Sequence, residues 1–344
     1  MEIALVVPSY FPKITGNAVS AKRILTGLCA TGHQVKIVDV ETLGVYVDAV
    51  IAAWDPDVTH AFHARRTGFL VKDRRPLVIS LTGTDCSRDL GRQDSRREVL
   101  EACRAAQALV VNHRATAEPL LALEPALAPK LRVVPKGIGP LEGEWAMRAT
   151  LGIPPERRVF VLPGGLRPVK GQLAAIRALD GLDVDLILAG PTLSEEYGAE
   201  VRREALPRPW VRIMDVKPHG RMAGVYRDAD VVLNCSEAEG LSNAVLEAMS
   251  FGRPVLAHDI PGNRELIAPG IAGLLYRDET ELREMAARLR DDAALRTTLG
   301  QGGALRARTQ HSPEAETRAL MEIYKEAIAA VPPRKKTLPT VIED

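Results

Sequence analysis

The chain has 344 residues, of which 46% are hydrophobic and 26% charged, and its formal net charge is only +1. This length suits two domains of about 150 residues each, and the composition is that of an ordinary globular protein. So small a net charge gives no global field that would recruit nucleic acid or an acidic membrane. No apolar stretch approaches the roughly 20 residues that cross a bilayer, so we expect no transmembrane segment, while peripheral membrane contact stays open.

The chain begins with the apolar run MEIALVVP, which could be mistaken for a signal peptide. It has no positive charge at its start, it is very short, and no small-residue cleavage site follows, so we expect a buried first strand instead. The cysteines are scattered, without a CxxC pair or a histidine at zinc spacing; they are Cys29, Cys86, Cys103 and Cys235. This pattern argues against a disulfide framework or a structural metal and favours the reducing cytoplasm.

Short runs rich in β-branched residues alternate with helical patterns along the chain. The first series of expected strands covers residues 3–8, 34–40, 57–62, 76–83, 108–112 and 131–137, with helices near 18–31 and 95–106. A second series has strands at 158–165, 184–190, 210–215, 230–236 and 254–259, with helices at 171–180, 219–227, 242–251, 279–300 and 313–330. Nearly continuous apolar strands with helices between them indicate parallel sheets covered on both faces. The predicted fold class is α/β, with two Rossmann-like, doubly wound domains that bind ligands at the carboxyl ends of their strands.

The domain boundary is expected in segment 139–156, which is rich in glycine, proline and charge. We place the N-terminal domain at 1–148 and the C-terminal domain at 149–312. Residues 331–344 contain adjacent prolines and a basic run, and we expect them to form a flexible end.

Segment 236–263 is the most informative part of the sequence. A strand ends there, a glycine-containing loop follows, and Ser242 or Asn243 is placed to cap a helix that reads AVLEAM. The start of such a helix favours a phosphate, because its free amides and its dipole attract anions. Glu239 and Glu247 flank this helix start, and a carboxylate there can accept two hydroxyl hydrogen bonds, as a ribose diol requires. The alternative for either acid alone is a favourable interaction with the helix dipole.

A basic turn in segment 162–173 is the second candidate. Gly164 and Gly165 end a strand and permit a tight turn, and Arg167 and Lys170 follow before the next helix. Cations beside the carboxyl end of a strand suit a diphosphate leaving group, whose charge grows as its bond breaks. The alternative is a solvated basic turn.

Three weaker signals lie in loops. Gly16 and Asn17 precede a helix after the first strand, although Gly-Asn is also a common turn. Asn263 follows the strand at 254–259 and either contacts a ligand or caps a helix, and Glu265 is a candidate for a secondary contact.

Histidines and hydroxyls follow two later strands of the first series. His60 and His63 lie at predicted strand ends that face one crevice, and Thr82–Asp85 follow the next strand. His63 is a candidate contact for a donor or an acceptor, and a structural role stays equally open. Arg65 and Arg66 suit either an anionic acceptor or the solvated surface.

The spacing of Glu239 and Glu247, followed by AMSFGRPV over 248–255, resembles the family 4 retaining glycosyltransferases of the GT-B architecture, in which two Rossmann-like domains face a central cleft. The resemblance implies that Glu247 holds the donor ribose and that Glu239 sits beside the transferred sugar and the β-phosphate. It also implies that the backbone of Gly240-Leu241-Ser242 faces the diphosphate or the sugar, and that Asn263 lies in the loop that closes the donor pocket.

The same resemblance assigns an arginine and a lysine to the diphosphate. Lys170 matches the family's lysine, whereas Gly165 stands where the commonest form of the motif has its arginine. Arg167 is a candidate to reach the phosphate from a different backbone position, and whether it replaces that arginine stays open. Gly16, with Asn17 where the family often has a second glycine, would line the cleft. Many relatives have a histidine after the later strand that contacts the donor sugar. Here Gly83 with Thr82, Thr84 and Asp85 stands at that place, so the histidine's role is not transferred. His63 is a separate catalytic candidate.

The implied activity is transfer of a sugar, with retention at the anomeric carbon, from a nucleotide-sugar donor, for which a UDP-sugar is favoured. Neither a metal nor a cofactor is expected, since the nucleotide sugar is a co-substrate. The acceptor is an unidentified small molecule, glycan or lipid, and nucleic acid is not a partner. The resemblance also implies that the N-terminal domain is the acceptor side and that the helix at 313–330 returns to it.

Two subgroups resemble different parts of the chain. The stretch SEAEGLSNAVLEAM with GLRPVKG most resembles the glycosyltransferase 1 domain-containing proteins, whereas FHARRTG and RPLVISLTGTD resemble selenosugar synthases, which implies an inorganic or small anionic acceptor. A catalytically silent nucleotide-sugar-binding module and an epimerase or phosphorylase are alternatives. A Rossmann-type oxidoreductase is disfavoured because the first strand leads into PSYFPKITGN rather than a GxGxxG turn.

Overall fold

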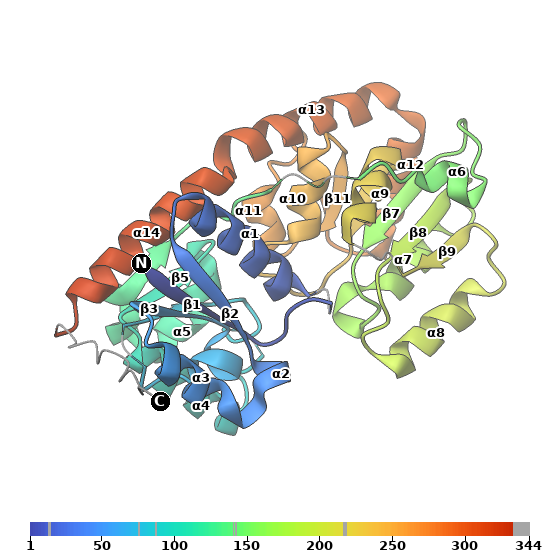
Figure 1. The fold of residues 1–344 in the computed structure, drawn as a ribbon. Helices are drawn as coiled ribbons and strands as arrows, with labels where there is room; N and C mark the ends of the chain where they lie inside the picture. Colours follow the sequence, from blue (N-terminus) through green and yellow to red (C-terminus); the bar gives the residue numbers. More distant parts are fainter. Residues whose placement is uncertain are drawn as a thin grey trace, which may run out of the picture. The chain divides into compact units, whose positions relative to one another are not determined.

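The computed structural model describes residues 1–12, 15–74, 76–86, 88–139, 141, 143–215 and 219–332 (Figure 1). The chain divides into two compact units. Unit 1 contains Met1–Val134 and Glu314–Asp344, and unit 2 contains Pro135–Pro313.

Unit 1 is built on a six-stranded parallel sheet with the strand order β2-β1-β3-β4-β5-β6. The strands are β1 (Glu2–Val7), β2 (Gln34–Asp39), β3 (Val58–Phe62), β4 (Leu77–Ser80), β5 (Ala108–Val111) and β6 (Leu131–Val133). The α-helices are α1 (Gly16–Ala30), α2 (Val40–Leu43), α3 (Val47–Trp54), α4 (Gln93–Ala105), α5 (Glu118–Leu123) and α14 (Pro313–Ala329). Two hydrophobic clusters pack on the two faces of this sheet, which explains why its central strands are apolar throughout.

Unit 2 repeats this plan with the strand order β12-β11-β10-β7-β8-β9, again entirely parallel. Its strands are β7 (Val159–Pro163), β8 (Asp185–Ala189), β9 (Val211–Met214), β10 (Val231–Asn234), β11 (Val255–His258) and β12 (Leu274–Tyr276). Its helices are α6 (Met147–Leu151), α7 (Gln172–Leu179), α8 (Glu195–Ala205), α9 (Met222–Asp228), α10 (Asn243–Ser250), α11 (Pro261–Leu266), α12 (Glu279–Asp291) and α13 (Ala293–Gln310). The predicted fold class, two doubly wound α/β domains, is confirmed.

Some elements differ from the sequence-based prediction. The stretch 279–300 was expected as one helix, but it contains all of α12 and the start of α13. The Asp292 side chain accepts a hydrogen bond from Leu295 N and thereby starts the second helix. The short strand β12 and the helices α2, α3, α5, α6, α8 and α11 were not predicted.

The chain leaves unit 1 earlier than the boundary expected at residue 148. Residues after Val134 pack with unit 2: Met147 is fully buried in its core, and a Cβ on Gly224 would lie 1.9 Å from the Trp145 carbonyl oxygen. Arg148 donates hydrogen bonds to Asp228 through both its backbone and its side chain. The glycine- and proline-rich segment therefore belongs to unit 2 rather than forming a linker in front of it.

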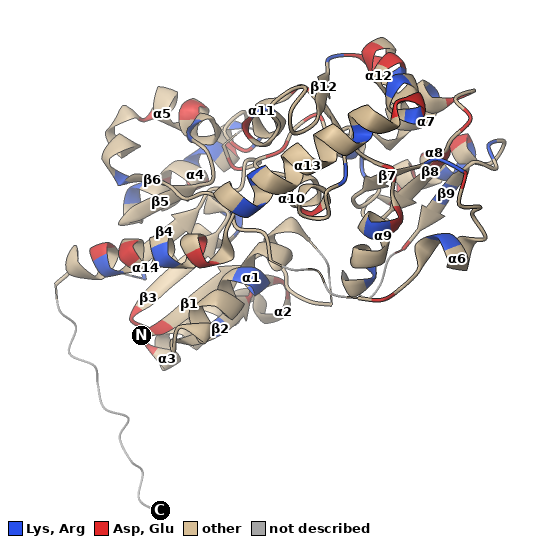
Figure 2. Ribbon diagram, turned by 90° about the horizontal axis from the view of Figure 1, so that it is seen from above, with Lys and Arg blue, Asp and Glu red and all other residues tan. Residues whose placement is uncertain are grey.

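Helix α14, red in Figure 1, packs against the strands and helix α1 of unit 1. Tyr324 lies 2.6 Å from His60 of β3, and the Arg23 guanidinium of α1 donates to both oxygens of Glu316 at 2.7 and 2.9 Å. Acidic and basic residues are interspersed along the rest of α14 (Figure 2). Its apolar residues complete one face of the unit 1 core; they are Leu320, Ile323, Tyr324 and Ala327. Residues 333–344, most of the predicted tail, lie outside the described residues.

Candidate functional site

In doubly wound sheets, ligands bind at the carboxyl ends of two neighbouring strands from which the chain continues towards opposite edges of the sheet. In unit 2 this point lies between β7 and β10, because β8 and β9 follow on one side while β11 and β12 follow on the other. In unit 1 it lies between β1 and β3 for the same reason. We call these two places the unit 2 switch point and the unit 1 switch point.

Lys170 and Glu239 meet at the unit 2 switch point. Lys170 ends the 3₁₀ turn Pro168–Lys170 after β7, and Glu239 lies in the loop after β10. The Lys170 ammonium donates a hydrogen bond to Glu239 Oε1, and the Ser236 hydroxyl donates to the same oxygen at 2.8 Å. Both charged side chains are mostly buried, with 14% and 16% of their surfaces exposed. The predicted cation and carboxylate thus form one ion pair.

The environment of Glu239 favours its anionic form. Burial by itself would raise the pKa of this carboxyl group. The positive charge of Lys170 and hydrogen bonds from Lys170 and Ser236 outweigh burial, Arg167 adds to the effect, and the pKa lies below its ordinary value. A diphosphate that enters this place would offer Lys170 a second anion, so it would compete with Glu239 for the ammonium group.

The turn before Lys170 depends on Gly165. Its carbonyl accepts a hydrogen bond from Gln172 Nε2 at 3.1 Å. A Cβ at this position would lie 2.4 Å from the Leu193 side chain, so an arginine here would require Leu193 to move. Arg167 is exposed, and it is close enough to lower the pKa of Glu239. Arg167 is therefore the arginine of this turn that lies near the Lys170–Glu239 ion pair.

Ser242, rather than Asn243, is the N-cap of α10. Its hydroxyl oxygen accepts hydrogen bonds from Val245 N at 3.4 Å and from Asn234 Nδ2 at 3.0 Å. The Leu241 side chain is buried in the core of unit 2, which anchors the loop just before the helix. The loop Gly240-Leu241-Ser242 is thus held at Leu241 and at Ser242.

Glu247 lies on α10 and is 5% exposed. Its Oε2 accepts a hydrogen bond at 2.7 Å from the hydroxyl of Tyr226, which is completely buried on α9. Burial raises the pKa of Tyr226, and the neighbouring carboxylate raises it further, so the phenol stays protonated and donates. Tyr226 was not predicted, and the available signal is that a buried tyrosine hydroxyl needs a polar partner.

Asn263 is completely buried and connects α11 to β10. Its Nδ2 donates to Asn234 Oδ1 at 3.1 Å and to the His258 carbonyl at 2.9 Å, while its Oδ1 has no hydrogen-bond partner among the described residues. The N-cap of α11 is Ile260, so Asn263 does not cap that helix. Asn263, Asn234 and Ser242 form one chain of hydrogen bonds that ends at the start of α10.

Gly16 and Asn17 are the first two residues of α1, whereas we expected them to precede the helix. The helix begins earlier because the Thr15 side chain accepts a hydrogen bond from Ala18 N at 3.2 Å and acts as the N-cap. The start of α1 therefore lies at the unit 1 switch point, after β1.

His63 directly follows β3, and its backbone has the strained φ value of 86°. The π-helical turn Ala64–Gly68 comes next, a conformation that is frequent at functional sites. The imidazole is buried: Nδ1 accepts from Arg66 N at 3.3 Å, and Nε2 lies 3.2 Å from Thr84 Oγ1 and 3.5 Å from Asp89 Oδ2. Burial lowers the pKa of His63 and the nearby carboxylates oppose this only partly, so the ring is neutral at pH 7.

Asp85 fixes the loops around His63. Its carboxylate accepts hydrogen bonds from the backbone amides of Ala64 at 3.0 Å, Thr82 at 2.9 Å and Cys86 at 3.2 Å. The predicted stretch Thr82–Asp85 therefore contributes Asp85 as a clamp and Thr84 as a hydrogen-bond partner of His63.

The predictions for Arg65 and His60 of unit 1 are corrected by the structure. Arg65 already contacts carboxylates, at 2.7 Å from Glu98 and 3.8 Å from Asp89, so it does not present an unpaired cation to an anionic acceptor. His60 is not at a strand end. It lies inside β3 on the face covered by α14, where it contacts Tyr324 and lies 2.8 Å from Ser80 Oγ.

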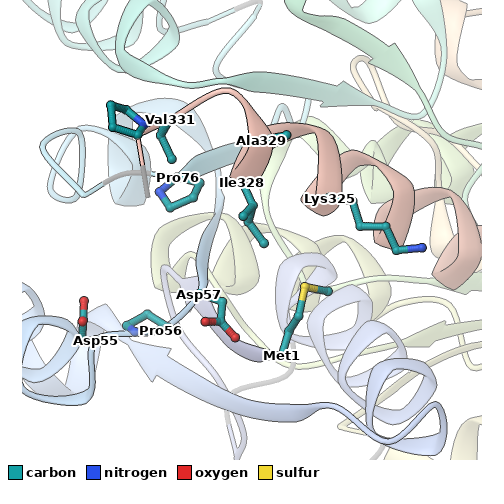
Figure 3. Close-up of a pocket in the computed structure, with 10 residues that line it drawn as sticks. Met1, Asp55, Pro56, Asp57, Pro76, Lys325, Ile328, Ala329 and Val331 are labelled. Carbon is teal, nitrogen blue, oxygen red and sulfur yellow. The ribbon is translucent and has the colours of Figure 1, made fainter. Parts of the chain in front are cut away.

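A hollow of about 520 Å³ lies at the end of the unit 1 sheet opposite to its switch point (Figure 3). It is lined by Met1, Asp57 and Pro76, which precede β1, β3 and β4, and by the end of α14. This is the amino end of the strands, away from the switch point. Among the described residues, no helix is long and apolar enough to cross a membrane, and no group of three or more His, Cys, Asp or Glu residues is placed to hold a metal ion.

Residues 157–292, which contain the unit 2 switch point, match the family model described as glycosyl transferases group 1. A D-inositol 3-phosphate glycosyltransferase of Kineococcus radiotolerans is 30% identical over 305 residues, which cover 80% of this chain and 67% of that protein. The chain belongs to the family of glycosyl transferases group 1. The glycosyltransferase 1 domain-containing protein 1 of Xenopus tropicalis is 26% identical over 316 residues, covering 88% of this glycosyltransferase and 92% of the relative.

Solved structures agree on the fold of this glycosyltransferase. HepE of Anabaena, solved with UDP and glucose, has a TM-score of 0.80 at 20% identity, covering 94% of this chain and 99% of HepE. A sucrose-phosphate synthase of Thermosynechococcus elongatus has a TM-score of 0.79 at 20% identity, covering 96% of this chain and 100% of the other. The two parallel-sheet Rossmann-like domains are those of GT-B glycosyltransferases.

Proposed function

We propose that this glycosyltransferase moves a sugar from a UDP-sugar to a hydroxyl acceptor, with retention at the anomeric carbon and without a metal, as in family 4. The observation that carries the proposal is the convergence of Lys170, Glu239 and the start of α10 at one switch point. A cation beside a helix N-terminus suits a diphosphate, and the sugar to be transferred is bound to that diphosphate.

Glu247 is the proposed ribose ligand. It lies on the same helix whose first turn would receive the phosphates, and Tyr226 orients its carboxylate. A carboxylate held in one orientation can accept both hydrogen bonds of a ribose diol. Uracil as the base is supported by the similar HepE structures, which were solved with UDP and with UDP-glucose.

Lys170 and Arg167 would stabilise the departing diphosphate, together with the dipole of α10. The bond between the anomeric carbon and the diphosphate oxygen breaks, and a bond from that carbon to the acceptor oxygen forms on the same face. The acceptor's proton passes to the departing diphosphate, so no carboxylate nucleophile is required. Glu239, kept anionic by Lys170, would accept hydrogen bonds from hydroxyls of the transferred sugar.

Unit 1 would bind the acceptor beside His63. The ring is neutral and lies next to Asp89 and Thr84, so this place offers hydrogen-bond acceptors to a polyol. A small anionic acceptor is the second candidate, because several relatives are named D-inositol 3-phosphate glycosyltransferases. We also propose a cytoplasmic location, consistent with four free cysteines.

The decisive test is a thermal-shift panel of UDP, GDP, ADP and NAD, followed by transfer assays with UDP-glucose in the presence of EDTA. We expect UDP to raise the melting temperature most, because a ligand that binds only the folded state stabilises it. myo-Inositol and D-inositol 3-phosphate are the first acceptors to compare, with the product's anomeric configuration determined by NMR. Stabilisation by NAD alone, or an inverted product, would contradict the proposal.

A further inference from the structure

Lys136 is a buried lysine outside the predicted site. It is 8% exposed, and its ammonium donates a hydrogen bond to the carbonyl oxygen of Leu241 at 2.8 Å. Burying an ammonium group is unfavourable unless hydrogen bonds compensate for the lost water. This group therefore lies at a defined place, on the loop Gly240-Leu241-Ser242 that precedes α10.

The hydrogen bond fixes more than a carbonyl group. A trans peptide unit is planar, and its C=O and N–H point in opposite directions. The carbonyl of Leu241 and the amide of Ser242 belong to the same peptide unit. When Lys136 holds the carbonyl on its own side of the loop, the Ser242 N–H is directed to the other side, and the positive charge polarises the unit so that this N–H becomes a stronger donor.

Other contacts hold the same loop from different directions. A Cβ on Gly262 would lie 1.9 Å from the Gly240 carbonyl oxygen, so α11 packs directly on the loop backbone. The Ser242 hydroxyl is held by Asn234, and the Leu241 side chain is buried. With these neighbours fixed, the Lys136 hydrogen bond selects which way the Leu241–Ser242 peptide faces.

Lys136 also lies at the place where the chain passes between the units. It is the second residue of unit 2, and its own carbonyl oxygen lies 2.8 Å from His311 Nδ1, two residues before unit 2 ends. The amide of Ile138 donates to the His311 carbonyl at 2.8 Å. Both connecting segments are therefore hydrogen-bonded to each other next to the residue that holds the loop.

We propose that Lys136 is a positioning residue for the donor diphosphate. It orients the Ser242 amide towards the phosphates, and it connects the loop Gly240-Leu241-Ser242 to the two segments that join the units. This inference rests on the proposed function, because it takes the loop before α10 as the diphosphate site. It concerns a residue that touches the loop rather than the substrate.

The test compares UDP with uridine, which lacks the phosphates, by ligand-observed NMR titration of the full chain. Lys136→Met keeps an unbranched side chain but removes the donor and the charge. We expect it to raise the Kd for UDP about 10-fold and to leave the Kd for uridine within about 2-fold. Lys325→Met is the matched control, since it removes an exposed lysine of α14 that is paired with Glu322, and both Kd values should stay unchanged.

A merely structural role predicts a different result. Equal weakening of UDP and uridine by Lys136→Met, or unchanged binding of both, overturns the inference while leaving the proposed function intact. If the wild-type chain binds neither ligand, the proposed function fails and the inference fails with it. If Lys136→Met does not fold, as judged by its circular-dichroism melt, Lys136→Leu takes its place, because leucine also lacks a donor and a charge. The same selective loss of UDP binding is expected, and the same outcomes overturn the inference.

Discussion

The two switch points have the same sheet topology, but their polar groups are organised differently. In unit 2, charged and polar side chains from separate elements contact each other: Lys170 contacts Glu239 from another loop, and Tyr226 of α9 contacts Glu247 of α10. In unit 1, one carboxylate, Asp85, gathers three backbone amides and holds the strained residue His63. A doubly wound sheet thus decides where a ligand binds, while the loops decide whether the place is rich in charge or in hydrogen-bonding groups.

The largest effect should come from breaking the ion pair of unit 2. Lys170→Ala should lower kcat about 100- to 1,000-fold, because it removes a cation from the departing diphosphate. The variant should also raise the pKa of Glu239, since burial remains while the attraction of Lys170 is lost. The acid limb of the pH profile should therefore move to higher pH. Steady-state kinetics against pH measure both effects, and a normal kcat would remove Lys170 from the reaction.

The ribose ligand should affect binding more than turnover. Glu247→Ala should weaken UDP binding about 10- to 100-fold, because it removes charge-assisted hydrogen bonds. Tyr226→Phe leaves the carboxylate in place but removes the group that orients it, and about a 5-fold loss is expected. Calorimetric titration with UDP measures both. Equal affinities for all three proteins would place the ribose elsewhere.

Unit 1 should show the opposite behaviour. His63→Asn should lower the transfer rate about 10-fold, because a hydrogen-bonding group beside the acceptor is lost, and should leave UDP affinity unchanged. Asparagine is chosen because it tolerates positive φ better than most residues, which keeps the backbone in place. Paired measurements of UDP affinity and of transfer from UDP-glucose test this. Loss of UDP binding would show that the two switch points do not divide donor and acceptor in this way.

Acid should destabilise unit 1 through His60. Complete burial lowers its pKa from 6.5 to about 3, so between these values the unfolded chain binds a proton that the folded chain does not. The stability from this group is fully present above about pH 6.5 and is lost as the pH falls, at about 1.4 kcal/mol per pH unit. Hydrogen exchange at pH 7 and pH 5 should show greater loss of protection in β3 and α14 than in unit 2. His60→Gln should flatten this dependence, and an equal response of both units would contradict it.

The sequence predicted the sheets well because central parallel strands are apolar on both faces, as in β7, where all five residues are buried. It missed β12, which has only three residues and is partly exposed, and α8, where six of eleven residues carry charge. The ion pair of Lys170 with Glu239 could be anticipated because both residues follow strands of one sheet.

Other parts of the site depend on contacts that no local pattern contains. Tyr226 and Glu247 are 21 residues apart on different helices, and Lys136 and Leu241 are 105 residues apart. His60 was placed at a strand end, although alternation along β3 puts it on the same face as Phe62, on which its ring stacks. The boundary was set too late because glycine and proline were interpreted as a linker, whereas the backbone there packs closely against α9.

The return of α14 to unit 1 has a consequence for synthesis of the protein. The N-terminal half leaves the ribosome first, but its sheet lacks one covering layer until the last helix emerges. A nascent chain that stops near residue 312 carries all of the second unit's secondary structure, while Ile3, Leu5 and Phe62 of the first lack their partners from α14. Unit 2 can therefore complete its native core before unit 1, although unit 1 is synthesised first. Until α14 emerges, the exposed apolar surface of unit 1 is a binding site for chaperones.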